Sequence, residues 1–190
     1  MSTLIYWFRN DLRLQDSPAL SKACREATQL IPVYVLAPEE TSTRWGFARE
    51  SHQRKRHLTE SLIALDTQCR ELGSRLLVLQ GDASTTLSAL VQFTQAQGII
   101  CEQIAAPEEQ AEVERLRAQG IKVQCVWQST MLELTTLPFT PQHMPDVFTQ
   151  FRQKLEAKGL RARQTVSKPA QLPGLASNLE IESVSLRQRL

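Results

Sequence analysis

A cluster of charged and amide side chains directly follows an apolar run near the amino terminus. The run covers residues 4–8 and carries the β-branched and aromatic side chains of a buried strand. The residues after it that could do chemistry are Arg9, Asn10, Asp11, Arg13 and Asp16. Because open α/β sheets bind ligands where their strands end, these side chains could line a ligand site. They could equally pair with one another and stiffen the loop, since ion-pair networks imitate functional sites.

Further candidate residues stand at the ends of later apolar runs. Pro38 follows the second run, Gly81 and Asp82 follow the third, and Glu102 belongs to the fourth. The carboxyl ends of parallel strands meet at one edge of a sheet. We therefore expect these positions to share that edge with the first loop.

Basic residues crowd the beginning of a helix that we predict over residues 47–72. They are Arg49, His52, Arg54, Lys55, Arg56 and His57. Positive charge at a helix start opposes the helix dipole, so water or a bound anion must compensate it. A solvated helix face is the simpler interpretation, and an anion site is the alternative.

The elements that must position these residues alternate along the chain. Apolar runs predict strands at residues 4–8, 30–36, 74–80, 99–105 and 121–127. Helices are predicted between them, the first opened by Ser17 as cap and Pro18 as first residue, the third capped by Ser84 or Thr85 and running to about Gln97, and the fourth opened by Pro107. This alternation predicts an α/β fold, a doubly wound, Rossmann-like, five-stranded parallel sheet with helices on both faces.

The sequence lacks the motifs of the commonest α/β enzymes. It contains no Gly-x-Gly-x-x-Gly after the first strand, no phosphate-binding loop and no Gly-x-Ser-x-Gly elbow. The Cys and His residues show no metal-ligand spacing, so we expect no metal. Cys101 and Cys125 lie inside apolar runs and are expected to be small core residues. Together with the lack of a leader or a membrane-spanning run, this favours a cytoplasmic protein.

The pattern changes past Trp127. Residues 128–142 are irregular, and residues 144–159 predict an amphipathic helix whose apolar face carries Val147, Phe148, Phe151 and Leu155. Prolines then mark an extended linker. We expect a domain over 1–142, an amphipathic helix over 143–159 packed on or beside it, and a partly disordered interdomain linker over 160–190. From residue 151 onward, eight Lys or Arg face three Glu, which suits an acidic partner or a solvated surface.

Two stretches resemble the DNA photolyase and cryptochrome family. Residues 7–20, beginning Trp-Phe-Arg-Asn-Asp-Leu-Arg-Leu, resemble its amino-terminal signature. Residues 137–156, with Leu-Pro-Phe-Thr-Pro and then Met-Pro-Asp-Val-Phe, resemble its DASH branch, and residues 43–61 also fit through Arg54 and Glu60-Ser61. The resemblance therefore extends over the chain up to the predicted linker.

The resemblance implies a function for a larger protein. It implies blue-light-driven, FAD-dependent repair of cyclobutane pyrimidine dimers, preferentially in single-stranded DNA, by a helical FAD-binding domain that follows the α/β domain. That domain is missing here, so we expect no catalytic residue in this chain and no activity from it alone. The implied partners are the FAD-binding domain, in cis or in trans, and DNA in the complete protein, with no membrane. Arg9, Asn10, Asp11, Arg13 and Asp16 would then form scaffold and interdomain surface.

The resemblance also implies an antenna chromophore. Related proteins commonly bind methenyltetrahydrofolate near the end of the fourth strand, with a carboxylate contacting the pterin. Ala105 stands where the family usually has Glu, so this contact does not carry over directly to this chain. The candidate residues of the antenna crevice are Glu102, Glu108, Glu109, Pro38 and Arg54.

Two other functions remain open from the sequence. One is a stand-alone nucleotide- or pterin-binding module that uses the same strand-end crevice. The other is a docking domain without a small ligand, which contacts its partner through the helix over 144–159 and the basic tail.

Overall fold

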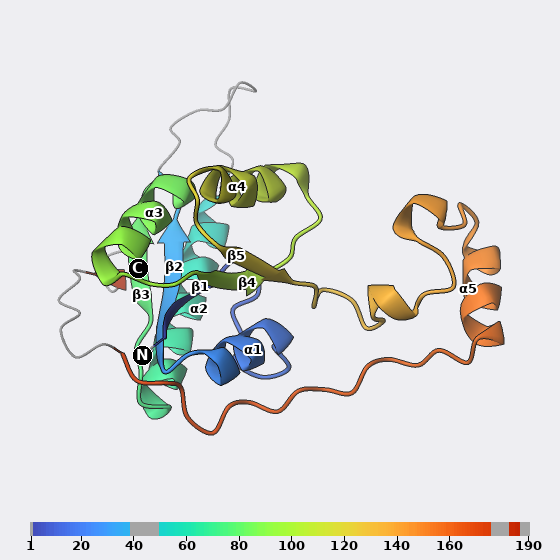
Figure 1. The fold of residues 1–190 in the computed structure, drawn as a ribbon, viewed down its shortest axis with the longest axis horizontal. Coiled ribbons are helices and arrows are strands. Elements are labelled where there is room, and N and C mark those ends of the chain that lie inside the picture. Colours follow the sequence, from blue (N-terminus) through green and yellow to red (C-terminus); the bar gives the residue numbers. More distant parts are fainter. Residues whose placement is uncertain (1, 39–49, 176–182, 187–190) are drawn as a thin grey trace.

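A five-stranded parallel sheet forms the centre of the protein (Figure 1). The computed structural model describes residues 2–38, 50–175 and 183–186. The strands are β1 (Thr3–Phe8), β2 (Gln29–Leu36), β3 (Leu77–Gln80), β4 (Ile99–Glu102) and β5 (Val123–Val126). Their order is β3-β2-β1-β4-β5, and every neighbouring pair is parallel. The winding direction reverses between β1 and β4, which places the topological switch point there.

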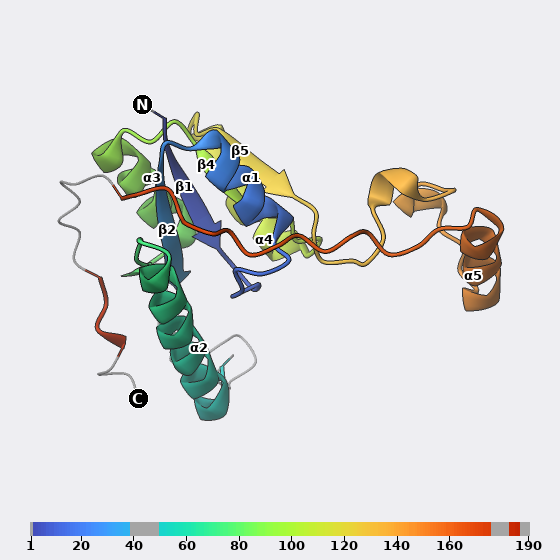
Figure 2. The same cartoon turned by 90° about the horizontal axis from the view of Figure 1, so that it is seen from below.

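Four helices cover the two faces of the sheet (Figure 2). They are α1 (Pro18–Glu26), α2 (His52–Glu71), α3 (Ala83–Thr94) and α4 (Pro107–Ala118). Successive residues of β1 point to opposite faces, so Tyr6 packs in the core under α1 and α2, while Ile5 and Trp7 pack in the core under α3 and α4. The doubly wound α/β fold predicted from the sequence is confirmed.

The start of α1 follows its sequence signal. Ser17 accepts a hydrogen bond from the backbone N–H of Leu20, and Pro18 is the first helical residue. Ser51 caps α2 in the same way through the N–H of Arg54 at 3.2 Å. The helix begins at His52, so its predicted extension over residues 50–51 is wrong, and the predicted beginning at residues 47–49 lies outside the described residues.

The predicted bounds of α3 were wrong at both ends. Asp82, rather than Ser84 or Thr85, is the cap, because its Oδ1 accepts from the N–H of Thr85 at 2.9 Å and from the Ser84 hydroxyl at 2.6 Å. The helix ends at Thr94 because Gln95 takes a left-handed conformation with φ 53°. The carboxylate accepts from several donors at once, which a single hydroxyl cannot match.

Three strands are shorter than their apolar runs. Residues 74–76 are held at the end of α2, where the Ser74 N–H donates to the Cys69 carbonyl and the Leu76 N–H donates to Asp66. β3 therefore begins only at Leu77. The ladder between β4 and β5 covers four residue pairs and ends at Glu102 and Val126.

Beyond β5 the chain leaves the sheet layers. Residues 131–160, which we call the α5 arm, contain two short 3-10 turns and α5 (Phe148–Ala157). Both cartoon views place α5 apart from the sheet (Figures 1 and 2), and each of its residues is at least partly exposed. Phe151 contacts Phe148 and Phe139, with ring centroids 6.5 and 5.5 Å apart.

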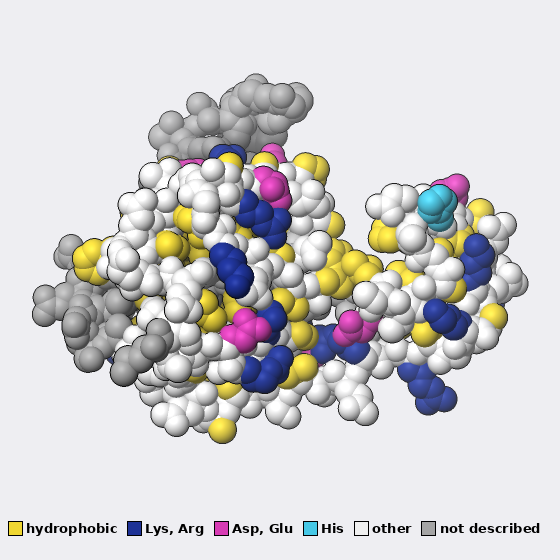
Figure 3. All heavy atoms as spheres, in the orientation of Figure 1, with side chains coloured by type: hydrophobic (Ala, Val, Ile, Leu, Met, Phe, Trp, Pro, Cys, Tyr) yellow, Lys and Arg dark blue, Asp and Glu magenta, His cyan; other side chains and the backbone are white. Residues whose placement is uncertain are grey.

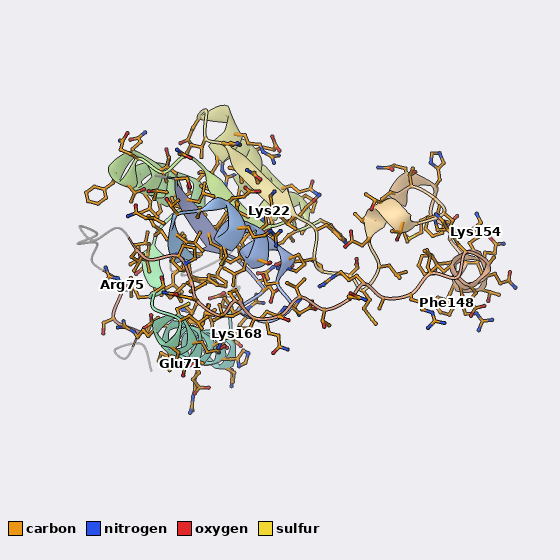
Figure 4. The ribbon with its side chains drawn as sticks, turned by 60° about the horizontal axis from the view of Figure 1, so that its bottom comes forward. Lys22, Glu71, Arg75, Phe148, Lys154 and Lys168 are labelled. Atoms are coloured by element: carbon orange, nitrogen blue, oxygen red, sulfur yellow. The ribbon has the colours of Figure 1, made fainter. Side chains whose placement is uncertain are left out.

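Residues 161–175, the return segment, run extended from the α5 arm back to the α/β body. Leu172 is buried among the core residues under α1 and α2, and its N–H donates to the Leu72 carbonyl. Lys168 lies 4.0 Å from Glu71, at the end of α2 (Figure 4). The extended chain that follows the α5 arm is thus fixed to the body at several points.

No helix in the described part of the chain is long and apolar enough to cross a membrane. Within residues 2–38, 50–175 and 183–186, no group of three or more His, Cys, Asp or Glu is placed to hold a metal ion.

Candidate functional site

A pocket of about 560 Å³ lies at the carboxyl ends of β1, β4 and β5. Its walls come from the loop after β1, the chain after β5 and the return segment. Five residues predicted from the sequence line it, and these are Asn10, Asp11, Arg13, Asp16 and Glu102. The strand-end loops therefore meet at one edge, as expected of a parallel sheet.

Glu102, the last residue of β4, carries an unsatisfied buried oxygen. Glu102 as a whole is only 8% exposed. Oε1 accepts a hydrogen bond from the Ser129 hydroxyl at 2.7 Å, whereas Oε2 has no hydrogen-bond partner among the described residues. Buried carboxylate oxygens are normally paired, because desolvation without compensation is unfavourable. A ligand with an N–H or O–H donor would supply the missing partner.

Asp11 brings a second carboxylate to the same pocket. Its Oδ2 accepts from Gln128 Nε2 at 2.9 Å and lies 3.2 Å from Arg13 Nε. Burial raises the pKa of Asp11 above its ordinary value, and the Arg13 charge opposes this, while the nearby Glu102 adds to it. Asp11 and Glu102 thus give one wall of the pocket a negative charge, which Arg13 only partly neutralises.

Gln128 connects this wall to α1. Besides donating to Asp11, it accepts at Oε1 from the Ala19 N–H at 3.0 Å. It is 3% exposed and stands just after β5, at the same edge as Glu102. The sequence analysis missed Gln128 and Ser129, although their position after a predicted strand was a usable signal.

The return segment closes one side of the pocket through Arg163. Its guanidinium forms a two-pronged pair with Asp16, with Nη1 to Oδ1 at 2.7 Å and Nη2 to Oδ2 at 3.1 Å. The Val166 N–H donates to the same carboxylate at 3.0 Å. The Arg163 hydrogen bonds, followed by that of Val166, hold the pKa of Asp16 below its usual range. Arg163 Nε is itself buried without a partner among the described residues.

The Arg9 side chain points to the face of the sheet that α3 and α4 cover, opposite to the face of Phe8. Its Nη2 donates to the Glu109 carbonyl and to Glu112 Oε2, both at 2.9 Å, and its guanidinium carbon lies 4.5 Å from the centre of the Trp7 ring. Phe8 and Arg9 point to opposite faces because side chains alternate along a strand. Arg9 therefore ties β1 to α4 and does not line the pocket.

The other predicted antenna residues also lie outside this pocket. Pro38 and Glu108 are exposed, and Glu109 offers its backbone carbonyl to Arg9. The Arg54 side chain is 72% exposed and lies 3.8 Å from Glu50. Ala105 is exposed as well, and its carbonyl accepts from Gln110.

The basic start of α2 is largely exposed. Its five described members are His52, Arg54, Lys55, Arg56 and His57, of which Lys55 is half-buried; Arg49 lies outside the described residues. Arg56 pairs with Glu60 one turn later at 2.8 Å. This exposure fits the solvated helix face.

The sheet order and this pocket define the class of protein. It is a doubly wound α/β domain with a polar, ligand-sized pocket at the carboxyl edge of its strands. A comparison with protein families then identifies it further. The family model described as DNA photolyase matches residues 4–184, and the chain belongs to the DNA photolyase family.

Individual relatives support the DASH branch. The chain is 36% identical over 163 residues to "Cryptochrome DASH, chloroplastic/mitochondrial" of Arabidopsis thaliana, which covers 81% of this chain and 28% of the relative. It is 34% identical over 189 residues to the Cryptochrome DASH of Xenopus laevis, and the match covers 95% of this chain and 36% of that protein. The crystal structure of a Synechocystis cryptochrome superposes with a TM-score of 0.88 at 29% identity, covering 96% of this chain and 39% of that one. The chain spans about a third of these proteins and corresponds to their amino-terminal domain.

Proposed function

We propose that this chain acts as the amino-terminal domain of a DASH-type cryptochrome, where it holds an antenna chromophore and docks a helical FAD-binding domain. In the complete protein, the proposed activity is blue-light-driven, FAD-dependent repair of cyclobutane pyrimidine dimers, preferentially in single-stranded DNA. Single strands suit such an enzyme because an unpaired base is easier to extrude into an active site. The observation that carries the antenna role is the unpartnered, buried Glu102 Oε2 in the strand-end pocket.

The chemistry of the pocket supports a polar heterocycle as its ligand. Its volume of about 560 Å³ falls within the range of small-molecule sites. The unpartnered Glu102 oxygen requires a donor, and the unpartnered Arg163 Nε requires an acceptor. A pterin ring carries both kinds of group side by side, and its ring amide and amine are suitable donors to a carboxylate. We therefore propose methenyltetrahydrofolate as the antenna, with Glu102 in place of the carboxylate that Ala105 lacks.

The remaining candidate residues border the same edge of the sheet. Pro38 follows β2, Arg54 lies in the first turn of α2, and Glu108 and Glu109 lie in the first turn of α4. They would contact only a ligand that extends from the pocket toward α2 and α4.

A titration tests the antenna role. We expect the chain to bind methenyltetrahydrofolate with a change in its near-ultraviolet absorbance, and Glu102→Gln to weaken binding about tenfold or more by removing a charge-assisted hydrogen bond. Glu26→Gln is the matched control, because Glu26 is an exposed glutamate at the end of α1 and does not line the pocket. Unchanged affinity in Glu102→Gln, or an equal loss in Glu26→Gln, would contradict the assignment.

The α5 arm supports the docking role. Its exposed large apolar residues are Met131, Met144, Val147 and Phe148, which are 75%, 55%, 54% and 73% exposed. Apolar and basic side chains intermix over the arm (Figure 3), and Lys154 lies on the same helix as Phe148 (Figure 4). Exposed apolar patches commonly mark interaction sites. Because the chain spans about a third of its relatives, we propose the helical FAD-binding domain as the occupant.

The division of labour between the two domains gives a second test. The 190-residue chain with added FAD should reverse no pyrimidine dimers under blue light, because the proposed catalytic site belongs to the other domain. Light-dependent dimer reversal by the chain alone would overturn this proposal.

We also propose a cytoplasmic location. Its support is that all four cysteines are free, which suits a reducing compartment. Thiol labelling of the endogenous protein after cell fractionation would test both points together.

A further inference from the structure

Cys101 and Cys125 face each other across the β4–β5 ladder. They are paired in register on adjacent strands, and their Sγ atoms are 3.7 Å apart. Both side chains pack in the core under α3 and α4. Neighbouring strands lie about 4.8 Å apart, which falls within the range of Cα separations that a disulfide can bridge. Side-chain rotation can therefore bring the sulfur atoms into bonding distance without moving the strands.

The two thiols are not equivalent. Cys125 is half-buried on the edge strand β5, and Cys101 is fully buried on β4. Arg117 of α4 places Nη2 3.8 Å from the Cys125 Sγ, while its other contacts, to the Val123 carbonyl and Glu114, fix the guanidinium there. The accessible sulfur thus has a cationic neighbour, and the inaccessible one lies directly behind it.

Electrostatics distinguishes this pair from the other cysteines. The hydrogen bond from the Cys101 thiol, followed by the charges of Arg117 and Arg9, lowers the pKa of Cys125, against opposing effects of burial and Glu114. The same hydrogen bond and burial raise the pKa of Cys101. By contrast, burial raises the pKa of Cys24 to about 11 and that of Cys69 to about 12. Thiolates, rather than thiols, are the reactive species toward oxidants.

We propose that Cys101 and Cys125 are an oxidation site, at which hydrogen peroxide converts the two thiols into a disulfide between β4 and β5. The Cys125 thiolate attacks one peroxide oxygen, so that an S–O bond forms, the O–O bond breaks and hydroxide leaves. Cys101 then attacks the sulfur of the resulting sulfenic acid. The S–S bond forms, the S–O bond breaks, and the Cys101 proton leaves with that hydroxyl as water. The proton that Cys125 released on ionising neutralises the hydroxide, so in total two thiols lose two electrons and two protons, and one peroxide becomes two waters.

The proposed disulfide would lie next to the strand-end pocket. Cys101 directly precedes Glu102, and Cys125 directly precedes Val126, which pairs with Glu102 in the ladder. The cross-link would therefore fix the strand ends that carry the pocket carboxylate. The proposal itself does not depend on what the pocket binds.

The experiment uses the reduced 190-residue chain, exposed to equimolar hydrogen peroxide and then alkylated. Peptide mapping should find a Cys101–Cys125 disulfide, with Cys24 and Cys69 recovered alkylated. Cys125→Ser should abolish the cross-link and leave Cys101 as a thiol. Cys101→Ser should leave a sulfenic acid on Cys125 that a 1,3-dione traps. Cys24→Ser is the matched control, and it should oxidise like the unaltered chain.

Three results would overturn the proposal. These are a disulfide that includes Cys24 or Cys69, alkylation of Cys125 that peroxide pretreatment does not reduce, and sulfenic acid trapping on Cys125 in the unaltered chain with no cross-link. Circular dichroism of each variant checks that it folds. If Cys125→Ser does not fold, Cys125→Ala takes its place, because it removes the same sulfur without adding a hydroxyl to the core side of β5.

Discussion

The α/β body and the α5 arm put similar apolar sequence to opposite uses. In the body, the apolar residues of β1 are buried within two cores, one on each face of the sheet. In the arm, Val147 and Phe148 form a comparable apolar stripe that remains largely exposed. The difference shows that an amphipathic pattern predicts an interface, but does not say whether the same chain supplies the other side. The body completes its interfaces internally, whereas we propose that the arm completes its interface with a second domain.

The largest effect on stability should come from shortening a side chain in the core of the body. Leu62 of α2 is fully buried under the sheet. Leu62→Ala should lower the free energy of unfolding by about 2–5 kcal/mol, because it removes buried methyl groups and leaves a cavity. Urea denaturation followed by circular dichroism measures this. A change below about 0.5 kcal/mol, the usual range of surface substitutions, would show that the body is less tightly packed than its burial implies.

A smaller loss should follow from removing the cap of α3. Asp82 accepts hydrogen bonds from the Thr85 N–H and from two hydroxyl groups. Asp82→Ala should destabilise the body by about 1 kcal/mol, because it leaves a helix-start N–H without its partner. Ser84→Ala is the control in the same turn, and it should have the smaller effect since Ser84 is only a donor to the cap. If Ser84→Ala destabilised the chain more than Asp82→Ala in denaturation experiments, the result would favour the hydroxyl cap predicted from the sequence.

The junction between body and arm should respond to pH. Hydrogen bonds from Arg163 and Val166 hold the pKa of Asp16 below its ordinary value. A lowered folded-state pKa stabilises the folded form above the unfolded value of about 3.9, and this contribution disappears as the pH falls through the folded-state pKa. The Val166 amide, whose proton is donated to Asp16, should therefore lose its hydrogen-exchange protection selectively in acid.

Asp16→Asn gives the matched control for this junction. Asn tolerates the left-handed conformation that Asp16 adopts at φ 51°, so the substitution removes the charge without straining the backbone. In the variant, the Val166 amide should be only weakly protected from hydrogen exchange at neutral pH, and this protection should change little in acid. Equal protection in both proteins across this range would mean that backbone geometry, rather than the Arg163 pair, fixes the return segment.

Local patterns were enough to predict the fold and part of the site. Ser17 and Pro18 marked the beginning of α1, and apolar runs marked each strand, because these signals act within a few residues. The position of Glu102 and Asp11 at one edge followed from the parallel sheet alone. What the sequence did not predict depends on long-range contacts. Arg163 reaches Asp16 across 147 residues of chain, and no periodicity or motif connects the two.

The register of the strands was also beyond a sequence-based prediction. Apolar runs indicated that Cys101 and Cys125 were core residues, but only the ladder between β4 and β5 brings their sulfur atoms together. The direction of Arg9 was missed for a related reason. Five candidate residues follow β1 at Phe8. Arg9 continues the alternation of the strand and points to α4, whereas Asp11 lies in the loop beyond the strand, where its carboxylate accepts from Gln128 at the pocket.

The smallest effect on stability should come from the arm, and it would sharpen the comparison most. Phe148 is 73% exposed, so Phe148→Ser should change the free energy of unfolding of this chain by about 0.5 kcal/mol or less. The same substitution should weaken capture of a separately expressed FAD-binding helical domain, measured by calorimetry, because it removes an exposed aromatic anchor. Phe93 of α3 is the matched control, since it is 66% exposed on the body and Phe93→Ser should leave that binding unchanged. Should Phe148→Ser destabilise the chain by as much as a core substitution does, the arm's apolar stripe would already be packed in solution, and the contrast between body and arm would fail.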